Sequence, residues 1–220
     1  MGKVIPSQPL FIMLYGYPGA KKTYVSRQLC EHLLAAHLEG DRIRSELFDN
    51  PAYTKQENNI VDHLMNYMAG EFLAAGVSVV YDTNAMRVAQ RRALRDMARA
   101  AGAIPLIVWF QMDPETAFMR NKARDPKKMD DRYAPIYDTA QFQTMMNYMQ
   151  NPEPIDDYVV VSGRHIFPTQ LSAIMKKLYA MKAIKTQDST QGLAKPGLVN
   201  LIPNPPGQRP TGGRRNIVLR

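Results

Sequence analysis

Cysteine is nearly absent from this sequence, and long apolar runs are missing altogether. Cys30 is the only cysteine in 220 residues, so the chain cannot form an internal disulfide. We expect Cys30 to be a core residue of a reduced, cytoplasmic protein. No stretch approaches the roughly 20 apolar residues that a membrane span needs, and no basic lead with an apolar segment opens the chain. Composition therefore argues against a secreted or membrane-spanning protein.

Acidic residues are outnumbered by basic ones, but the excess is unevenly spread along the chain. The net charge is +8. Segment 183–220 holds six Lys or Arg residues and one Asp, which gives +5 there and leaves +3 for residues 1–182. The body is only mildly basic, so a nucleic acid partner is permitted but not required.

Segment 183–220 also differs from the body in its high Pro and Gly content and its lack of a helical period. We interpret it as a basic tail after a folded domain of residues 1–182. Apolar β-formers at 198–202 and 217–219 are suited to a sheet edge, which would permit self-association through the tail. A nucleic-acid-binding arm and a solvated tail without a role are the alternatives.

Short apolar runs alternate with amphipathic stretches through the body. This alternation predicts parallel strands joined by helical crossovers, hence an α/β three-layer sandwich with a central, mostly parallel sheet. Uniformly apolar strands are typical of a sheet that is covered on both faces. We predict strands at 10–15, 37–40, 77–81, 104–110 and 158–161, and helices at 23–36, 54–75, 87–101, 114–124 and 168–181, with a Met-rich helix ending near 150.

Two of these helices carry apolar side chains for which we expect ordinary packing. In the Met-rich helix these residues are Met145, Met146 and Met149. In the helix at 54–75 the residues expected to face inward are Ile60, Leu64, Tyr67, Met68 and Leu73.

Residues 16–23 read GYPGAKKT, one residue away from the P-loop pattern G-x-x-x-x-G-K-[ST]. The pattern requires a strand before it and a helix after it, and both are predicted here. In that arrangement successive backbone N–H groups and the positive end of the helix dipole surround a phosphate group. We therefore predict a nucleotide-binding loop made of Gly16, Tyr17, Pro18, Gly19, Ala20, Lys21, Lys22 and Thr23.

The last three residues of this loop have separate expected roles. Lys22 would reach the β- and γ-phosphates of ATP as a catalytic group, and the Thr23 hydroxyl would hold Mg²⁺. Lys21 replaces the second glycine of the pattern, and a side chain there costs about 1 kcal/mol of local strain. Because Lys21 also adds a second ammonium group, the sequence leaves open whether it weakens or aids the loop.

Three further polar stretches fit beside this loop. Asp41 and Arg44 follow the second predicted strand, Asp82 and Asn84 follow the third, and Arg120 and Arg124 stand four apart on a helix. Each alone is as consistent with a solvated pair or a strand-end cap. In an open α/β sheet, however, ligands bind at the carboxyl ends of the strands, and we expect these side chains to meet there.

With these motifs, residues 9–182 resemble the P-loop kinases of the polynucleotide 5′-kinase group, also described as AAA-type predicted kinases. The resemblance rests on GYPGAKKT, D-R-I-R at 41–44, D-T-N at 82–84 before an Arg-rich helix, and R-N-K-A-R at 120–124. It implies a P-loop NTPase sandwich with a small helical lid at about 120–150, and it implies ATP and Mg²⁺ as cofactors.

The resemblance also implies roles for single residues. Asp41 matches the general base for the acceptor hydroxyl, and Arg44 matches the residue that grips a phosphate of the acceptor. Asp82, with Asn84 of the same motif, matches the acidic residue that supports the acceptor site. Arg124 matches the catalytic lid arginine and Arg120 an auxiliary. A polar insert follows Arg124, so Arg132 is a second candidate for the lid arginine.

We predict an ATP-dependent kinase domain at 1–182 whose favoured acceptor is a polynucleotide 5′-OH. The alternative within enzymes is a small-molecule kinase similar to the zeta-toxin and antibiotic phosphotransferase branch. A third possibility is a non-catalytic nucleotide-binding module with a drifted P-loop. The sequence does not separate these acceptors, because they share the loop, the base and the lid.

Overall fold

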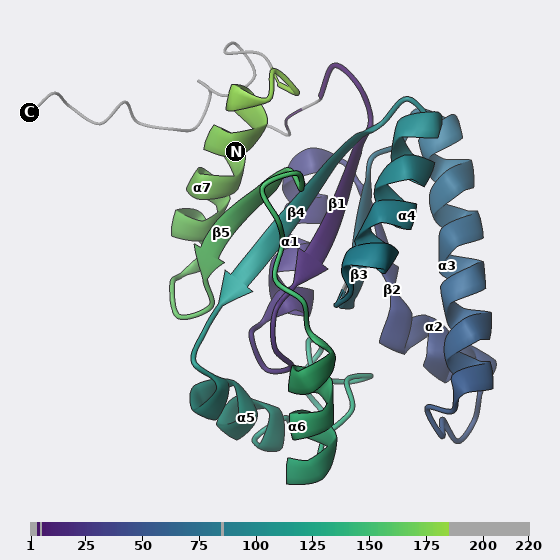
Figure 1. Cartoon of the computed structure of the whole chain (residues 1–220), viewed down its shortest axis with the longest axis vertical. Coiled ribbons are helices and arrows are strands. Elements are labelled where there is room, and N and C mark those ends of the chain that lie inside the picture. Colours follow the sequence, from purple (N-terminus) through teal and green to yellow (C-terminus); the bar gives the residue numbers. More distant parts are fainter. Residues whose placement is uncertain (1–3, 5, 85, 185–220) are drawn as a thin grey trace, which may run out of the picture.

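A computed structural model describes residues 4, 6–84 and 86–184 of the chain (Figure 1). Its centre is one five-stranded sheet in which every neighbouring pair is parallel. All five predicted strands are present, so the predicted parallel α/β sheet is confirmed. In spatial order the strands are β2 (Ala36–Glu39), β3 (Val79–Asn84), β1 (Leu10–Tyr15), β4 (Ile104–Gln111) and β5 (Tyr158–Ser162).

Helices cover both faces of this sheet. Helices α1 (Lys22–Leu33) and α7 (Phe167–Ala180) pack on one face, against alternate β1 residues such as Ile12. Helices α3 (Lys55–Ala74) and α4 (Val88–Ala100) pack on the other face, against Met13 and its neighbours. Every β1 residue is buried, which is why this strand is apolar without alternation.

Three shorter helices lie beyond the carboxyl ends of the strands (Figure 1). Helices α5 (Pro114–Lys122) and α6 (Thr139–Tyr148) agree with the prediction, and each has an Asp side chain as N-cap. Helix α2 (Gly40–Leu47) was not predicted. It is short and mostly polar and lacks a side-chain cap, so Asp41 in its first turn and Arg44 in its last turn are weak signals for a helix.

Most of the buried stripe of α3 is shifted by one position along the helix from the predicted stripe. Its buried side chains are Val61, Met65, Ala69 and Leu73. Ile60 and Tyr67, expected inside, are 43% and 62% exposed. The helix has apolar residues on more than one face, and contact with the sheet selects the face that is buried.

A buried ionic cluster fixes the segment between α6 and β5. Arg91 of α4 is fully buried and its Nε donates to Asp156 at 3.3 Å. Arg91 also donates to the backbone carbonyls of Gln150 and Asn151, both at 2.9 Å. Arg95 donates to the same carboxylate at 2.8 Å. Two arginines of the Arg-rich helix α4 therefore bind the segment between α6 and β5 and serve a structural role.

The described part of the domain ends inside the core. Ala183 and Ile184, which begin the predicted tail, are buried on the face covered by α1 and α7. The remaining tail, 185–220, with its predicted self-association, lies outside the described residues. No helix within the described residues is long and apolar enough to span a membrane.

Candidate active site

The predicted loop 16–23 connects β1 to α1, as a P-loop requires. Gly19 has φ +88°, and a Cβ there would stand 2.1 Å from the Ala117 carbonyl oxygen. A side chain is therefore excluded at Gly19 by both conformation and space. At Gly16 a Cβ would stand 2.8 Å from the Phe110 carbonyl oxygen, so the loop also packs closely against the end of β4.

Lys21 occupies a left-handed conformation, with φ 66° and ψ 29°. It is the N-cap of α1 and makes no side-chain cap hydrogen bond, and its side chain is exposed beside the cavity. The glycine of the P-loop pattern would adopt this conformation without strain, whereas a lysine pays on the order of 1 kcal/mol. The predicted strain at Lys21 is therefore present.

Lys22 reaches back over the loop. Its Nζ donates to the carbonyls of Gly16 at 2.9 Å and Tyr17 at 3.1 Å. Burial, together with the nearby Arg124 guanidinium, lowers the pKa of Lys22 to about 8. The ammonium group thus lies inside the loop, where an incoming phosphate would replace the two carbonyls as its partner.

The loop borders a cavity of about 1510 Å³ at the carboxyl ends of the strands. Gly16, Tyr17, Ala20 and Arg132 do not line it; Ala20 is fully buried, and Gly16 and Tyr17 line a smaller cavity of about 710 Å³. The predicted residues that do line the large cavity are Pro18, Gly19, Lys21, Lys22, Thr23, Asp41, Arg44, Asp82, Asn84, Arg120 and Arg124.

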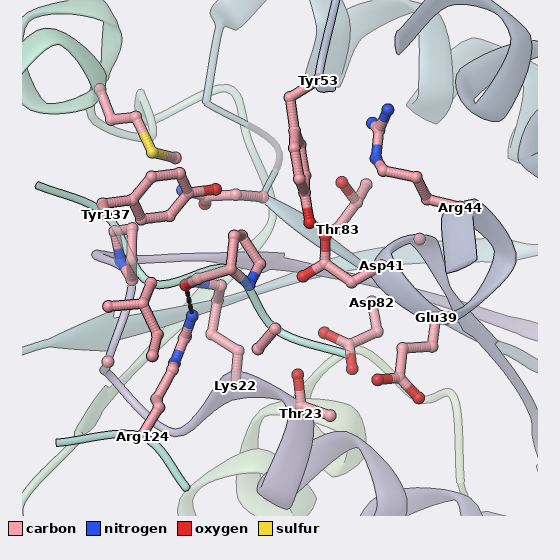
Figure 2. Close-up of a pocket in the computed structure, with 18 of the residues that line it drawn as sticks. Lys22, Thr23, Glu39, Asp41, Arg44, Tyr53, Asp82, Thr83, Arg124 and Tyr137 are labelled. Atoms are coloured by element: carbon pink, nitrogen blue, oxygen red, sulfur yellow. Dashed lines mark hydrogen bonds between the residues drawn. The ribbon is translucent and has the colours of Figure 1, made fainter. Parts of the chain in front are cut away.

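Asp41 lies in the first turn of α2 and faces the centre of the cavity (Figure 2). Burial and the neighbouring Asp82 carboxylate raise the pKa of Asp41 to about 6, against the opposing effect of Arg124, Arg44 and Lys22. A carboxylate with a pKa close to neutrality is suited to accept a proton at physiological pH and to release it again.

Asp82 lies beside Thr23 and Glu39 (Figure 2). It is 6% exposed, and its Oδ2 is 3.0 Å from His37 Nε2. Burial and Asp82 raise the pKa of Glu39 to about 7. The predicted acceptor-site residue Asp82 is therefore placed next to the predicted Mg²⁺ ligand.

The donor atoms at this point fit Mg²⁺. Within the described residues no group of three or more His, Cys, Asp or Glu side chains is placed to hold a metal ion. Mg²⁺ needs fewer protein ligands than that, because it keeps waters and shares the oxygens of a bound nucleotide. The Thr23 hydroxyl and an Asp82 oxygen are the hard donors that such a complex requires.

Two predicted substrate-binding residues are engaged within the protein. Arg44 donates to Glu57 at 3.2 Å and to Asn58 at 2.6 Å, and it is 7% exposed. Asn84 Oδ1 accepts from the Gly16 backbone N–H at 3.2 Å. Arg44 thus joins α2 to α3, and Asn84 ties the P-loop to the end of β3.

The candidate lid arginines occupy different positions. Arg124 donates to the Pro135 carbonyl inside the cavity (Figure 2), and burial lowers its pKa. Arg120 donates to the Gly163 carbonyl at 2.9 Å, after β5. Arg132 lies over the Tyr133 ring at 5.4 Å. Of the two candidates for the lid arginine, only Arg124 lines the cavity.

Five further residues, which the sequence did not indicate, shape this site. His37 and Glu57 position Asp82 and Arg44, while Glu39, Tyr53 and Tyr137 line the cavity. None belongs to a motif in which its spacing carries chemical meaning. The position of His37 two residues before Glu39 on a strand was the only available signal, because it places both side chains on the same face.

The strand order, the flanking helices and the loop between β1 and α1 define a P-loop NTPase fold. A family model described as AAA domain matches residues 11–152, more than half of the chain. The chain therefore belongs to this AAA domain family. None of the curated proteins matches it in sequence.

Solved structures share the fold at low sequence identity. A gluconokinase from Sinorhizobium meliloti 1021 is 19% identical, with a TM-score of 0.56 over 79% of this chain and 94% of that one. Chaetomium thermophilum Kti12 in complex with ADP-AlF3 is 16% identical, with a TM-score of 0.63 over 80% and 99%. The Mycobacterium tuberculosis APS kinase CysC, with AMPPNP and APS, is 16% identical, with a TM-score of 0.57 over 79% and 99%.

Proposed function

We propose that this chain is an ATP-dependent kinase that transfers the γ-phosphoryl group of ATP to a hydroxyl of an acceptor. One observation carries the proposal: a carboxylate with a raised pKa, Asp41, faces Lys22 and Arg124 across a single cavity that begins at a P-loop. The similarity in fold to a gluconokinase and an APS kinase, and to Kti12 with ADP-AlF3, supports a nucleotide-dependent phosphotransferase.

The proposed mechanism assigns each charged group one task. The loop N–H groups and Lys22 bind the β- and γ-phosphates, and Thr23 and Asp82 would hold Mg²⁺, which supplies positive charge at the phosphate oxygens. Asp41 accepts the proton of the acceptor hydroxyl while that oxygen bonds to the γ-phosphorus and the bond to ADP breaks. Arg124 offsets the charge on the transferring group, and the segment around α6 excludes water.

Of the two acceptor classes, we favour a small molecule over the polynucleotide 5′-OH that the sequence placed first. The Arg-rich helix carried part of the resemblance to polynucleotide kinases, but its Arg91 and Arg95 are buried against Asp156. Arg44, the expected grip on an acceptor phosphate, is bound to Glu57. In both places a carboxylate of the protein engages arginine side chains that would otherwise be available to bind the phosphates of a nucleic acid.

Transfer of labelled phosphate from ATP tests the proposal. The acceptors are a 5′-OH oligonucleotide and a panel of nucleosides, sugars and sugar alcohols, with Asp41→Asn as the control variant. We expect label on at least one small molecule, and transfer slower by roughly 10²–10⁴-fold with the variant. Label on the oligonucleotide alone would instead support a polynucleotide 5′-OH as the acceptor. Tight binding of Mg·ADP without transfer to any acceptor would instead make the chain a nucleotide-binding module.

A further inference from the structure

The cations around Asp41 already have partners in the protein. Three of them lie close enough to lower the pKa of its carboxyl group: Lys22, Arg44 and Arg124. Lys22 is bound to the P-loop carbonyls, Arg44 to Glu57 and Asn58, and Arg124 to the Pro135 carbonyl. Lys22 and Arg124 are the groups that serve ATP in the proposed mechanism. Arg44 is therefore the one cation of the three left for an acceptor.

The bond between Arg44 and Glu57 is built into the chain around it. Glu57, in the first turn of α3, also accepts from the backbone N–H groups of Ala52 at 3.1 Å and Tyr53 at 2.7 Å. These contacts fold the loop before α3 onto the start of that helix. Release of Arg44 toward an anionic acceptor would leave the Glu57 carboxylate, whose side chain is 13% exposed, without its cation. We conclude that Arg44 shapes the loop rather than binding an anion.

The same loop presents Tyr53 to Asp41. Tyr53 has φ 55°, a conformation that costs a tyrosine roughly 1–3 kcal/mol and persists only where neighbouring contacts enforce it. The Glu57 carboxylate holds its N–H, and the Arg44 guanidinium lies 4.5 Å from its ring centre. Its hydroxyl consequently points at Asp41 (Figure 2). Burial and Asp41 raise the pKa of Tyr53 to about 12, so the phenol stays neutral.

Tyr137 enters the cavity from the opposite wall, with its hydroxyl directed toward Tyr53 (Figure 2). Its backbone N–H donates to Asn121 Oδ1 at 2.9 Å, and Asn121 is fully buried, so the tyrosine is anchored to α5. Burial and Asp41 raise the pKa of Tyr137 as well. Two neutral phenols therefore face the cavity near the proposed base, and Asn58, Thr83 and Gln141 add neutral polar groups to the lining.

Resting on the kinase function proposed above, we propose that the acceptor is a small, neutral, polyhydroxylated ring compound, of the class of free sugars, cyclitols and nucleosides. It binds between Tyr53 and Tyr137 and presents one hydroxyl to Asp41. The reasons are chemical. Phenol hydroxyls and amides both donate to and accept from alcohols, and aromatic side chains cover the apolar faces of a ring. The two guanidinium groups that act on Asp41 among the described residues, Arg44 and Arg124, already have partners in the protein.

Matched pairs of acceptors test the charge preference. Glucose is compared with gluconate and glucose 6-phosphate, and adenosine with AMP, by ADP release and by calorimetric binding to the Mg·ADP-loaded protein. We expect each neutral compound that is accepted to exceed its anionic partner at least tenfold in kcat/KM. Equal or better use of the anionic partner, or calorimetric binding of anions alone, would overturn the inference.

Single hydroxyl deletions test the two tyrosines. Tyr53→Phe and Tyr137→Phe should each raise the acceptor KM about 3- to 10-fold, the worth of one hydrogen bond, and leave the ATP KM unchanged. Tyr67→Phe is the matched control, because Tyr67 is exposed on α3. A change confined to the ATP KM would contradict the assignment of these tyrosines.

The two proposals fail in different ways. Phosphorylation of the oligonucleotide alone would support the proposed kinase activity and overturn the proposal of a neutral-ring acceptor. Absence of transfer to every compound, with neutral rings still bound according to calorimetry, overturns the kinase and retains the binding site. If the neutral compounds are neither bound nor phosphorylated, the inferred site is wrong.

Discussion

The two ends of the cavity are built in different ways. At the nucleotide end, one continuous stretch of eight residues, 16–23, supplies the loop N–H groups together with Lys22 and Thr23. At the acceptor end, side chains arrive from α2, from the loop before α3, from α3 and from the segment that ends in α6. Backbone groups recognise what all nucleotides share, whereas side chains can be exchanged without loss of the fold. In the proposed kinase, the common reaction and the particular acceptor are therefore encoded separately.

Each end also contains one strained residue, and the compensation differs. Lys21 has φ 66° and makes no side-chain cap hydrogen bond; in the proposed complex its charge beside the phosphates would offset the strain. Tyr53 has φ 55° and is held by Glu57 and Arg44. The strain at Tyr53 therefore points to a positioned side chain, because side-chain contacts enforce it.

The largest effect should come from the nucleotide end. Lys22→Ala removes a cation from the transferring group, and Thr23→Ala removes a hydroxyl proposed to hold Mg²⁺. Both should abolish transfer, because one cation at the transferring group of a phosphoryl-transfer enzyme is worth on the order of 10³–10⁵ in rate. Single-turnover transfer measures this, with far-ultraviolet circular dichroism as the control for folding. Residual activity within tenfold of the unmodified protein would mean that the loop does not position ATP.

Loss of the proposed general base at the acceptor end should lower the rate of transfer less than loss of Lys22 or Thr23. Asp41→Asn should lower the chemical step roughly 10²–10⁴-fold while ATP affinity changes little. In the unmodified protein the rate should fall as pH drops below about 6, since Asp41 then becomes protonated. A rate that stays constant between pH 5 and 8 would remove Asp41 from the mechanism.

The same substitution should stabilise the folded protein. Folding raises the pKa of Asp41 from 3.8 to about 6, so the folded state favours the protonated form. The ionised group therefore destabilises the protein increasingly between those pH values and fully above pH 6. Asp41→Asn should raise Tm at pH 7 and give no gain below pH 3.8, which thermal unfolding at both values would reveal.

The two candidate lid arginines offer a sharper comparison. Arg124→Ala should lower turnover by at least about 10²-fold, as loss of a group that stabilises transition-state charge does. Arg132→Ala, outside the cavity, should change turnover less than twofold. Rates at saturating ATP decide between them. A larger loss from Arg132 would show that the segment rearranges when ATP binds.

The smallest effect should come from Lys21→Gly. Glycine relieves the left-handed strain but gains freedom in the unfolded chain, so the free energy of unfolding should change by about 1 kcal/mol or less. Transfer should stay intact or increase, because Lys22 and Thr23 keep their register. Urea unfolding and steady-state kinetics would measure both. An inactive but folded variant would show that the Lys21 ammonium binds phosphate.

The site residues that could be predicted from the sequence follow the same contrast between the contiguous nucleotide end and the acceptor end, which is assembled from several elements. The P-loop was predictable because its pattern is local, and Asp41 and Asp82 line the cavity as expected because parallel strands bring their carboxyl ends together. Arg124, after α5, also lines the cavity as expected. Arg44 was also expected at the cavity, but its bond to Glu57 was not. Helix α2 was missed because its sequence signals are weak, and the buried stripe of α3 was missed except for Leu73 because packing against the sheet selects it.

By itself, the sequence determined the apolar strands, their alternation with helices and the phosphate-binding loop, since these follow from burial patterns and from contiguous residues. Only the tertiary structure decided which charged groups remain available. It paired Arg44 with Glu57, buried Arg91 against Asp156 and brought Tyr53 and Tyr137 into the cavity that Asp41 lines. The physical reason is that an ion pair or a cavity wall joins residues far apart in the chain, and spacing along the sequence says nothing about such distances.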